Sequence, residues 1–385
     1  MKNIRVGVMG IGFIGRLQVE ALRRIGITDI TTASRGGMEE ARAKAEEMNI
    51  DKYYGCYEDL INDPDIDVIH ICTPNTQHYA QAKAALLAGK HVLCEKPLTM
   101  TSEQAEDLIA IAEEKGLVHG VHFNIRYYPL MVHAKQMVEN GEIGKVLAIT
   151  GSYTQDWLLY ETDYHWSVEK ENAGNTKVVE DLGSHWFDLM EFIAGIKTKQ
   201  VFADLATFFP IRKKPAKPVE TFSGKLVDLE DTVDVEVSTE DYASVLIRFD
   251  NDARGCFTTS QSFAGRKNRC FFEIYGTKKA LSWDEERPNE LWVGCREEGN
   301  TIVMKDPCLL YESAQKYAAY PGGHNEGFNS ATKQLFADMY DYILSGDYKK
   351  GVKPVFPTFE SGLREAVIGE AIFESHTDEK WKDVT

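Results

Sequence analysis

The sequence predicts two domains: an α/β domain with a parallel, doubly wound sheet, and an α+β domain with a large, mostly antiparallel sheet. The length of 385 residues exceeds one ordinary core of about 100–200 residues. In the first third, apolar runs alternate with segments of helical spacing, which is typical of parallel βαβ units. From Lys145 onward, strand patterns predominate. We therefore expect domains at 1–124 and 125–385.

In the first domain, runs of strand length alternate with amphipathic segments of helix length. The expected strands are Ile4–Met9, Ile30–Ala33, Val68–Cys72, His91–Cys94 and Val118–Phe123. The expected helices are Ile14–Ile25, Met38–Met48, Thr76–Ala88 and Ser102–Lys115. The segment 53–60 fits neither pattern.

In the second domain, alternating apolar and polar residues indicate strands with one buried face. The expected strands are Lys145–Trp157, Gln200–Phe208, Val233–Ser238, Ser244–Phe249, Gly255–Ser260 and Cys270–Tyr275. Helices are expected at Gly183–Ile193 and Gly327–Leu344, where they would cover one face of the sheet.

Composition excludes several classes of function. Lys and Arg number 43 against 60 Asp and Glu, so the net charge of −17 repels nucleic acid. A basic group is interrupted by prolines and is expected to be a solvated loop; its members are Arg212, Lys213, Lys214 and Lys217. No run approaches the ~18 apolar residues of a membrane span, and no signal peptide is evident. The 7 cysteines include no CxxC pair. We expect a cytoplasmic protein without disulfides or a metal site.

The first βα turn contains Gly10, Gly12 and Gly15 in GxGxxG spacing. The first glycine permits a tight turn, the second lets the backbone approach a pyrophosphate, and the third allows close helix–strand packing. Phe13 and Ile14 open the helix, whose N-terminus attracts phosphate. A βα turn without a ligand is the alternative. The strand-to-helix context favours a dinucleotide.

The position that reads the adenosine ribose comes about 20 residues later. Here Ser34 and Arg35 stand where NAD-binding proteins carry an acid. A hydroxyl and a guanidinium suit a 2′-phosphate, so we expect NADP in preference to NAD. Alternatively, Arg35 stacks on adenine, which would serve either cofactor.

Two further turns are expected at the same edge of the sheet. Thr73-Pro74-Asn75, with His78 after it, follows one buried strand, and Glu95-Lys96-Pro97 follows the next. Ligands of open α/β sheets lie beyond the carboxyl ends of the strands. A lysine between a buried strand and a proline is therefore a candidate site residue.

Together, these motifs resemble the glucose–fructose oxidoreductase/inositol dehydrogenase family, called Gfo/Idh/MocA. The matching segments are the glycine turn, Thr73-Pro74-Asn75 with His78, Glu95-Lys96-Pro97, Asn124-Ile125-Arg126 and Asp181-Leu182-Gly183-Ser184-His185. The resemblance implies a nicotinamide-dependent enzyme that acts on a sugar, polyol or related compound. It further implies that Lys96, Asp181 and His185 are catalytic, and that the dinucleotide site extends over Thr73-Pro74-Asn75, His78, Glu95, Lys96, Asn124 and Arg126.

The chemistry suits these residue types. Asp181 and His185 are four residues apart at the start of an expected helix, on one face. His185 would remove the hydroxyl proton while hydride leaves carbon, and Asp181 would orient its ring. Lys96 would stabilise the charge that develops on oxygen. A purely structural Asp–His hydrogen bond is the alternative.

Polar and aromatic residues provide candidates for substrate binding. Amide groups and aromatic planes suit the hydroxyls and apolar C–H faces of a sugar. The candidates are Lys96, Arg126, Tyr153, Gln155, Trp157, Asp181 and His185. Some of these aromatic residues would also be explained as ordinary core.

Two alternative functions compete with a sugar dehydrogenase. One is a hydrolase or lyase that uses transient oxidation by a retained nicotinamide, and the other is a non-catalytic sensor. The sequence names neither the sugar nor the direction of reaction. We also expect a homodimer or homotetramer, because one apolar face of the second sheet would otherwise contact water. Cover by polar side chains and the segment Ile211–Asp228, in a monomer, is the alternative.

Overall fold

The computed structural model describes residues 4–216 and 232–385, which form two compact units. Unit 1 contains the chain up to Asn124 together with Phe328–Ala366. Unit 2 contains Ile125–Gly327 and the segment from Val367 onward. The segment Phe328–Ala366 therefore packs with the first sheet, whereas the expected division assigned it to the second domain. Amphipathic spacing shows that one face of a helix is buried, but not against which sheet.

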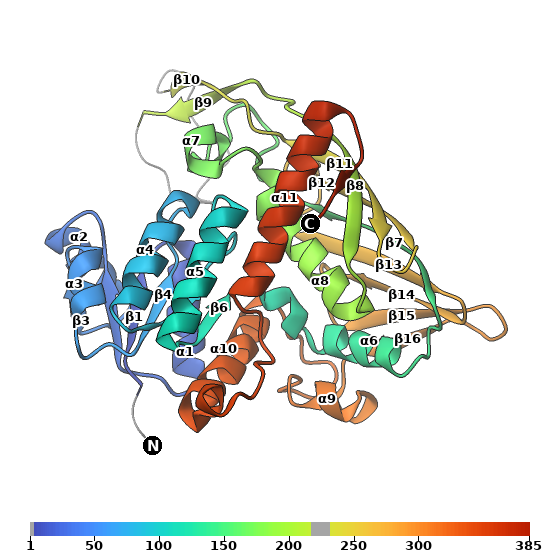
Figure 1. Cartoon of the computed structure of the whole chain (residues 1–385), viewed down its shortest axis with the longest axis horizontal. Coiled ribbons are helices and arrows are strands. Elements are labelled where there is room, and N and C mark those ends of the chain that lie inside the picture. The colour runs from blue at the N-terminus through green and yellow to red at the C-terminus, as the bar shows by residue number, and fades with distance from the viewer. Residues whose placement is uncertain (1–3, 217–231) are drawn as a thin grey trace. The chain divides into compact units, whose positions relative to one another are not determined.

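Unit 1 is built on a parallel sheet with the strand order β3-β2-β1-β4-β5-β6, which confirms the expected α/β class (Figure 1). Its strands are β1 (Val6–Met9), β2 (Ile30–Ala33), β3 (Lys52–Tyr54), β4 (Val68–Ile71), β5 (His91–Cys94) and β6 (His119–Val121). Its helices are α1 (Phe13–Arg24), α2 (Met38–Glu47), α3 (Tyr57–Asn62), α4 (Asn75–Leu87), α5 (Ser102–Lys115) and α10 (Phe328–Ser345). The strand order reverses between β1 and β4, where ligands of such sheets bind.

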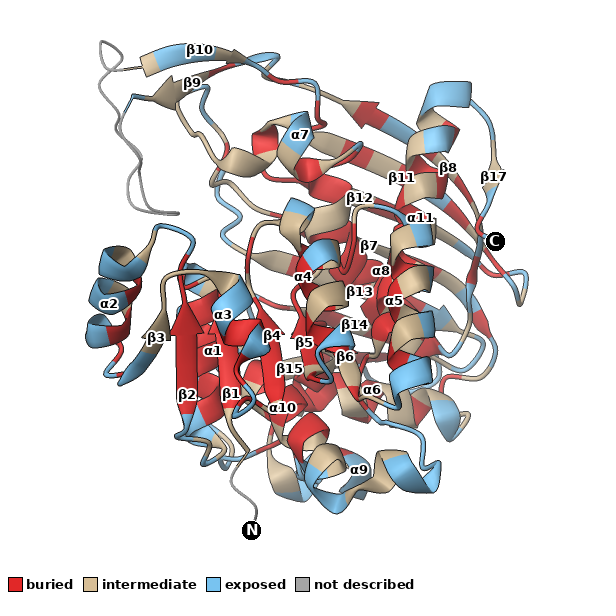
Figure 2. Ribbon diagram, turned by 60° about the vertical axis from the view of Figure 1, so that its left-hand side comes forward, coloured by how far each residue is buried: buried red, intermediate tan, exposed pale blue. Residues whose placement is uncertain are grey.

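The central strands of unit 1 form its core. Every residue of β1, β2 and β4 is buried, as the red strands of Figure 2 show. Strands that are covered on both faces by helices are buried along their whole length, and here the buried residues include the polar Thr31, Thr32 and His70. Helix α10 packs against α1 within unit 1. We had instead expected this helix to cover the sheet of the second domain.

Unit 2 is built on a nine-stranded sheet with the order β16-β15-β14-β13-β7-β12-β11-β8-β17. Only β7 and β12 pair in parallel among these neighbours, which confirms the expected antiparallel character. The first strands are β7 (Val146–Thr154), β8 (Thr198–Ala206), β11 (Tyr242–Phe249), β12 (Arg254–Ser260) and β13 (Arg269–Gly276). The remaining strands are β14 (Lys279–Asp284), β15 (Glu290–Cys295), β16 (Thr301–Met304) and β17 (Lys382–Asp383).

The helices of unit 2 include α6 (Pro129–Glu139) and α8 (Ser184–Ala194), which pack on each other. A π-helical turn, Val179–Gly183, leads directly into α8. Shorter helices are α7 (Lys170–Ala173) and α9 (Glu312–Gln315), and the division between the units falls within α11 (Phe359–Asp378). Within the described residues, no helix combines the length and the apolar character that crossing a membrane requires.

Strands β9 (Ile211–Pro215) and β10 (Thr232–Glu236) form a separate two-stranded sheet. Two expectations are therefore wrong. The run Val233–Ser238 does not belong to the large sheet, because β10 pairs with β9 and leaves Val233 exposed. Arg212 is not solvated but fully buried, because its guanidinium binds backbone carbonyls and a carboxylate. Lys217 and the rest of residues 217–228, which make up most of the segment Ile211–Asp228, lie outside the described residues.

Candidate active site

In the turn before α1, a different feature of the structure explains why each of the three positions is a glycine. Gly10 has a φ of +86°, and a Cβ there would collide with the backbone of Cys72. A Cβ on Gly15 would collide with the carbonyl oxygen of Gly10. A Cβ on Gly12 would meet no atom within 4 Å. Packing thus accounts for Gly10 and Gly15, whereas the open space at Gly12 fits a ligand that approaches the backbone closely.

The beginning of α1 has the electrostatics of an anion site. Gly12 is the N-cap and provides no side-chain cap, and the first turn of α1 carries no acidic residue. Phe13 is 56% exposed at the mouth of the turn, and Ile14 is half-buried. The helix dipole at this end favours a negative group. These residues therefore fit the pyrophosphate of a dinucleotide, which would add a hydride acceptor to the site.

The turn after β2 differs from our expectation in one respect. Ser34 is buried and Arg35 is exposed, but a carboxylate is present as well. Glu40, from the first turn of α2, lies over Gly36, where a Cβ would overlap its Oε2 atom. The other carboxylate oxygen forms an ion pair with Lys44. The expectation that no acid lies near Ser34 is therefore wrong, because the acid is supplied from the following helix.

His78 connects the two remaining turns of this edge. Its ring nitrogens lie 2.7 Å from the Thr73 carbonyl oxygen and 2.8 Å from the Pro97 carbonyl oxygen. Thr73 Oγ1 donates to Gln81 Oε1 at 2.6 Å, and Pro74 and Asn75 begin α4. The ring of His78 is thus engaged by backbone. It can position the two turns around a cofactor without contacting it.

Glu95, the residue before Lys96, is buried in the middle of a series of hydrogen-bonded side chains. It accepts hydrogen bonds from Gln18 Nε2 and from His122 Nδ1. Burial raises the pKa of Glu95, but His122, Lys96 and Gln18 together hold it below its usual range. The Glu95 carboxylate is therefore ionised and accepts two hydrogen bonds, and it fixes the backbone next to Lys96. Lys96 is half-buried and precedes a cis peptide bond to Pro97.

The series of hydrogen-bonded side chains continues from Glu95 in both directions. Gln18 Oε1 accepts from His70 Nδ1 at 2.6 Å, and His70 Nε2 accepts from Tyr340 at 2.8 Å. Burial and the nearby His122 lower the pKa of His70 to about 3, so this ring is neutral. On the other side, Asn124 Nδ2 donates to Thr332 Oγ1, which also bonds His122. Asn124 is therefore part of the support behind Lys96.

In unit 2, Asp181 lies within the π-helical turn and His185 in the first turn of α8. The expected helix therefore begins with a wider turn, of the kind often found at functional sites. Gln261 Nε2 donates to Asp181 Oδ2 at 2.6 Å. His185 is 6% exposed, and its ring centroid is 6.3 Å from that of Tyr153.

Three expected substrate-binding residues lie in one hydrogen-bonded network. Trp157 Nε1 donates to Gln155 Oε1 at 2.6 Å. Gln155 Nε2 and Tyr153 OH both donate to Asn268 Oδ1, at 2.6 and 3.0 Å. The structure thus brings together residues 153, 155 and 157, and adds Gln261 and Asn268, which the sequence analysis missed. Their signal was weak, because Gln261 follows β12 and Asn268 precedes β13, and both strands become neighbours of β7 only in the folded sheet.

The buried carboxyl of Glu285 lies next to this network, in hydrogen-bond contact with Tyr153. Tyr128 OH donates to its Oε1 at 3.1 Å. Burial raises the pKa of Glu285 to about 8, although hydrogen bonds with Tyr128, the Cys270 backbone and Tyr153 oppose the shift. A protonated carboxyl at neutral pH thus supports Tyr153 from below.

Arg126 binds Asp188 through two of its nitrogens, one of them Nε at 2.5 Å from Oδ2. Burial raises the pKa of Asp188, and the opposite charge of Arg126 counteracts this. The guanidinium also lies over the Phe192 ring. Most of the fork of Arg126 is therefore engaged within unit 2, which limits what it can offer to a cofactor or substrate.

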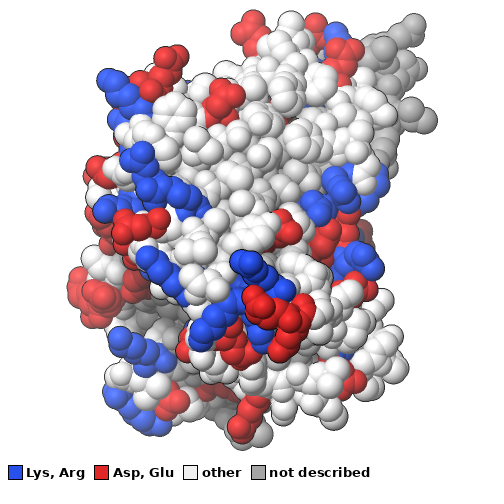
Figure 3. All heavy atoms as spheres, turned by 90° about the vertical axis from the view of Figure 1, so that its right-hand side faces the viewer, with Lys and Arg blue, Asp and Glu red and all other residues white. Residues whose placement is uncertain are grey.

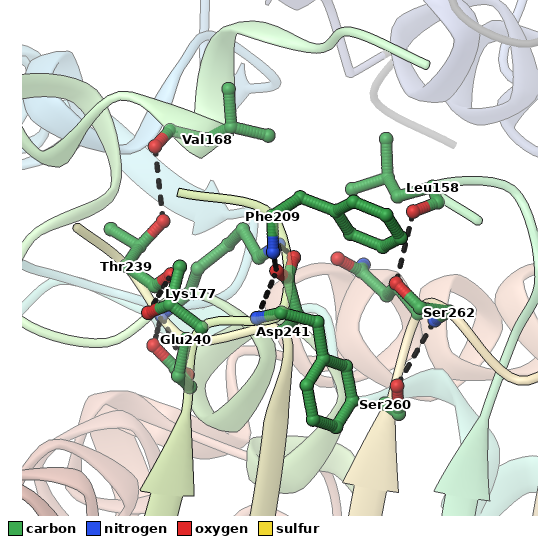
Figure 4. A network of polar contacts seen from close by, with 12 residues as sticks. Leu158, Val168, Lys177, Phe209, Thr239, Glu240, Asp241, Ser260 and Ser262 are labelled. Atoms are coloured by element: carbon green, nitrogen blue, oxygen red, sulfur yellow. Dashed lines mark hydrogen bonds and ion pairs between the residues drawn. The ribbon is translucent and has the colours of Figure 1, made fainter. Parts of the chain in front are cut away.

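A buried charge cluster supports the turn that carries Asp181. Lys177 Nζ and Arg212 both contact Asp241 Oδ1, at 2.9 and 2.8 Å. Glu240 accepts from the backbone N–H groups of Lys177 and Val179, and Figure 4 shows Glu240 and Asp241 beside Lys177. Although burial raises it, the pKa of Asp241 is held below its usual range by Lys177 and Arg212.

These features fit a two-domain oxidoreductase with a dinucleotide-binding unit and a second unit that carries a network of phenol, indole and amide groups. Comparison with known proteins agrees. Residues 4–123 match the model of the oxidoreductase family with an NAD-binding Rossmann fold, and residues 131–282 match the GFO/IDH/MocA C-terminal domain. The chain belongs to the Gfo/Idh/MocA family.

Several relatives have been named. Levoglucosan dehydrogenase of Pseudarthrobacter phenanthrenivorans is 30% identical over 100% of this chain and 99% of its own. A solved structure of levoglucosan dehydrogenase with NADH and L-sorbose has a TM-score of 0.89 and 29% identity, covering 100% of this chain and 99% of that one. Myo-inositol 2-dehydrogenase of Thermotoga maritima is 28% identical over 74% of this chain and 76% of its own.

Proposed function

We propose that this chain is a nicotinamide-dependent dehydrogenase or reductase of a sugar or polyol. The observation that carries the proposal is the open space at Gly12, in a turn whose other glycines are accounted for by packing. The similarity to levoglucosan dehydrogenase over the whole chain supports the substrate class. The glycine turn accommodates both NAD and NADP, because they share the pyrophosphate that it would contact.

We infer that Lys96, Asp181 and His185 form the catalytic set. When bound, the nicotinamide would accept hydride from the carbinol carbon. Histidine suits proton transfer near neutral pH, so His185 would take the hydroxyl proton at an imidazole nitrogen. Asp181 would stabilise the imidazolium, while Gln261 holds its carboxylate in place. The Lys96 ammonium would hydrogen-bond the reacting oxygen and stabilise its negative charge.

The wall formed by Tyr153, Gln155, Trp157, Gln261 and Asn268 favours an uncharged, polyhydroxylated substrate. Its groups are a phenol, an indole and amides, which pair with hydroxyls as donors and acceptors. The indole of Trp157 offers an apolar plane for the C–H face of a sugar ring. A cyclic sugar or polyol meets both requirements.

A substrate screen tests this proposal. Sugars, anhydrosugars and polyols are offered with each oxidised cofactor, and the reduced nicotinamide is followed by its near-ultraviolet absorbance. We expect net reduction with at least one compound. Product formation without net reduction, with cofactor retained on the protein, would instead indicate a hydrolase or lyase. Sugar binding without any product would indicate a sensor.

A further inference from the structure

NAD and NADP differ only at the 2′ position of the adenosine ribose, which Rossmann domains read at the turn after the second strand. In this chain that turn runs from Ser34 to Gly37, between β2 and α2. The usual acid at the end of β2 is replaced by Ser34. The selection between the two cofactors must therefore come from other groups at this turn.

Glu40 places a carboxylate oxygen in that turn. Its Oε2 atom occupies the position that a side chain at residue 36 would take, so Gly36 makes room for it. Ser34 is also hydrogen-bonded to the Glu40 carboxylate, and this bond together with that from Lys44 lowers the pKa of Glu40. The acid is thus ionised and held from two sides.

The two oxygens of Glu40 have separate surroundings. Oε1 pairs with Lys44, which lies one helical turn further along α2, whereas Oε2 faces the turn. The Glu40 side chain is 41% exposed, so a ligand reaches it. Lys44 is occupied by this pair, which leaves Arg35 as the exposed cation of the turn.

We propose that Glu40 replaces the missing acid of β2, accepts a hydrogen bond from the ribose 2′-hydroxyl, and makes this enzyme select NAD over NADP. A 2′-phosphate would bring a dianion against an ionised carboxylate, and like charges at contact distance disfavour binding. This inference rests on the proposed function as a nicotinamide-dependent enzyme. It reverses the preference that Ser34 and Arg35 alone suggest.

Direct binding tests this without requiring a substrate. NADH and NADPH are titrated against the purified protein by calorimetry, for the native chain and for Glu40→Gln. Native protein should bind NADH more tightly. Glu40→Gln removes the negative charge and releases Lys44, so NADPH binding should strengthen by about 10- to 100-fold. Glu39→Gln, an exposed acid one residue earlier on α2, is the matched control and should leave the ratio of affinities unchanged.

A second variant separates the position of the carboxylate from its charge. Gly36→Ala should displace Glu40 Oε2 while keeping the acid, and should also reduce the preference for NADH. Tighter binding of NADPH by the native protein would overturn the inference, as would an unchanged ratio in Glu40→Gln. Binding of neither cofactor would overturn the proposed function itself.

Discussion

Residues of the proposed dinucleotide site and of the proposed catalytic site differ in how directly their roles follow from their surroundings. Gly12 is informative because, among the residues that the structure describes, no atom lies within 4 Å of the position that a Cβ would take there. His78 and Asn124 matched family motifs, yet both ring nitrogens of His78 and the amide nitrogen of Asn124 bind neighbouring protein groups. We therefore assign them to positioning the turns around Lys96. His185 carries the most specific chemical prediction.

We expect His185→Asn to lower kcat by about 10²–10⁴-fold without changing the affinity for NADH, because it removes only proton transfer. Steady-state kinetics and cofactor titration check the two parts separately. His324→Asn, at an exposed histidine, is the control and should behave like the native protein. Near-normal turnover of His185→Asn would exclude this residue as the acid–base group.

Glu285 predicts a pH dependence of stability. Its pKa is about 8 in the folded protein against 4.5 ordinarily, so the folded state retains a proton that the unfolded chain loses. The free energy of unfolding should therefore fall as the pH rises from 4.5 to about 8, by about 1.4 kcal/mol per pH unit from this group.

Glu285→Gln keeps an oxygen that accepts from Tyr128 and should flatten that slope. Urea unfolding at several pH values across this range measures it. Glu286→Gln is the matched control: the pKa of Glu286 is lowered, with Arg266 and backbone N–H groups outweighing the effect of burial, so any change falls at acidic pH. An equally steep slope in Glu285→Gln would show that this carboxyl is not the source.

At the scale of elements, the buried charge cluster fixes segments that carry site residues. Arg212, from β9, donates to the carbonyl oxygens of Leu158, Tyr160 and Asp163, just beyond Trp157. Lys177 and Glu240 hold the backbone that leads into the π-helical turn of Asp181. A short two-stranded sheet outside the main fold is thus tied to the site.

We expect Arg212→Met to destabilise the protein by about 3–5 kcal/mol, because buried carbonyls lose their donor and Asp241 loses one of its two cations. Chemical unfolding measures this effect. Lys213→Met, the next residue on β9, breaks an exposed pair with Asp234 and should leave the unfolding midpoint nearly unchanged. Similar losses in both variants would contradict the role given to Arg212.

At the scale of the whole molecule, our expectation of an oligomer depends on one face of the large sheet. We call it the outer face and define it by the row of residues named next. Strand register places one row of residues across this face: Phe202, Leu246, Cys256, Thr150, Glu273, Ser282, Trp292 and Ile302. Leu246 and Ile302 are at least half exposed. Figure 3, seen from the right-hand side of Figure 1, shows a broad uncharged area between groups of charged side chains.

We propose that this outer face mediates a homodimer or homotetramer, which would remove its apolar side chains from water. Light scattering should give two or four times the chain mass of 43.4 kDa. Leu246→Arg should lower that mass, whereas Val355→Arg, at an exposed apolar residue of unit 1, should not. The mass of a single chain for the native protein would contradict the proposal.

The local spacing of residues was sufficient to predict the features that depend only on neighbours in the sequence. The parallel βαβ pattern of unit 1 follows from apolar runs that must be covered on both faces. The glycine turn follows from the backbone demands of one tight βα connection. For the same reason Lys96, directly between β5 and Pro97, was identifiable as a candidate without the fold.

Tertiary structure alone decided the features that depend on which segments become neighbours. Gln261 meets Asp181 because the π-helical turn packs against β12, and no local pattern encodes that contact. Arg212 is buried because carbonyls from another segment converge on it, although its own sequence context is basic and proline-rich. A charge is recognisable in sequence, but the groups that face it are set by packing.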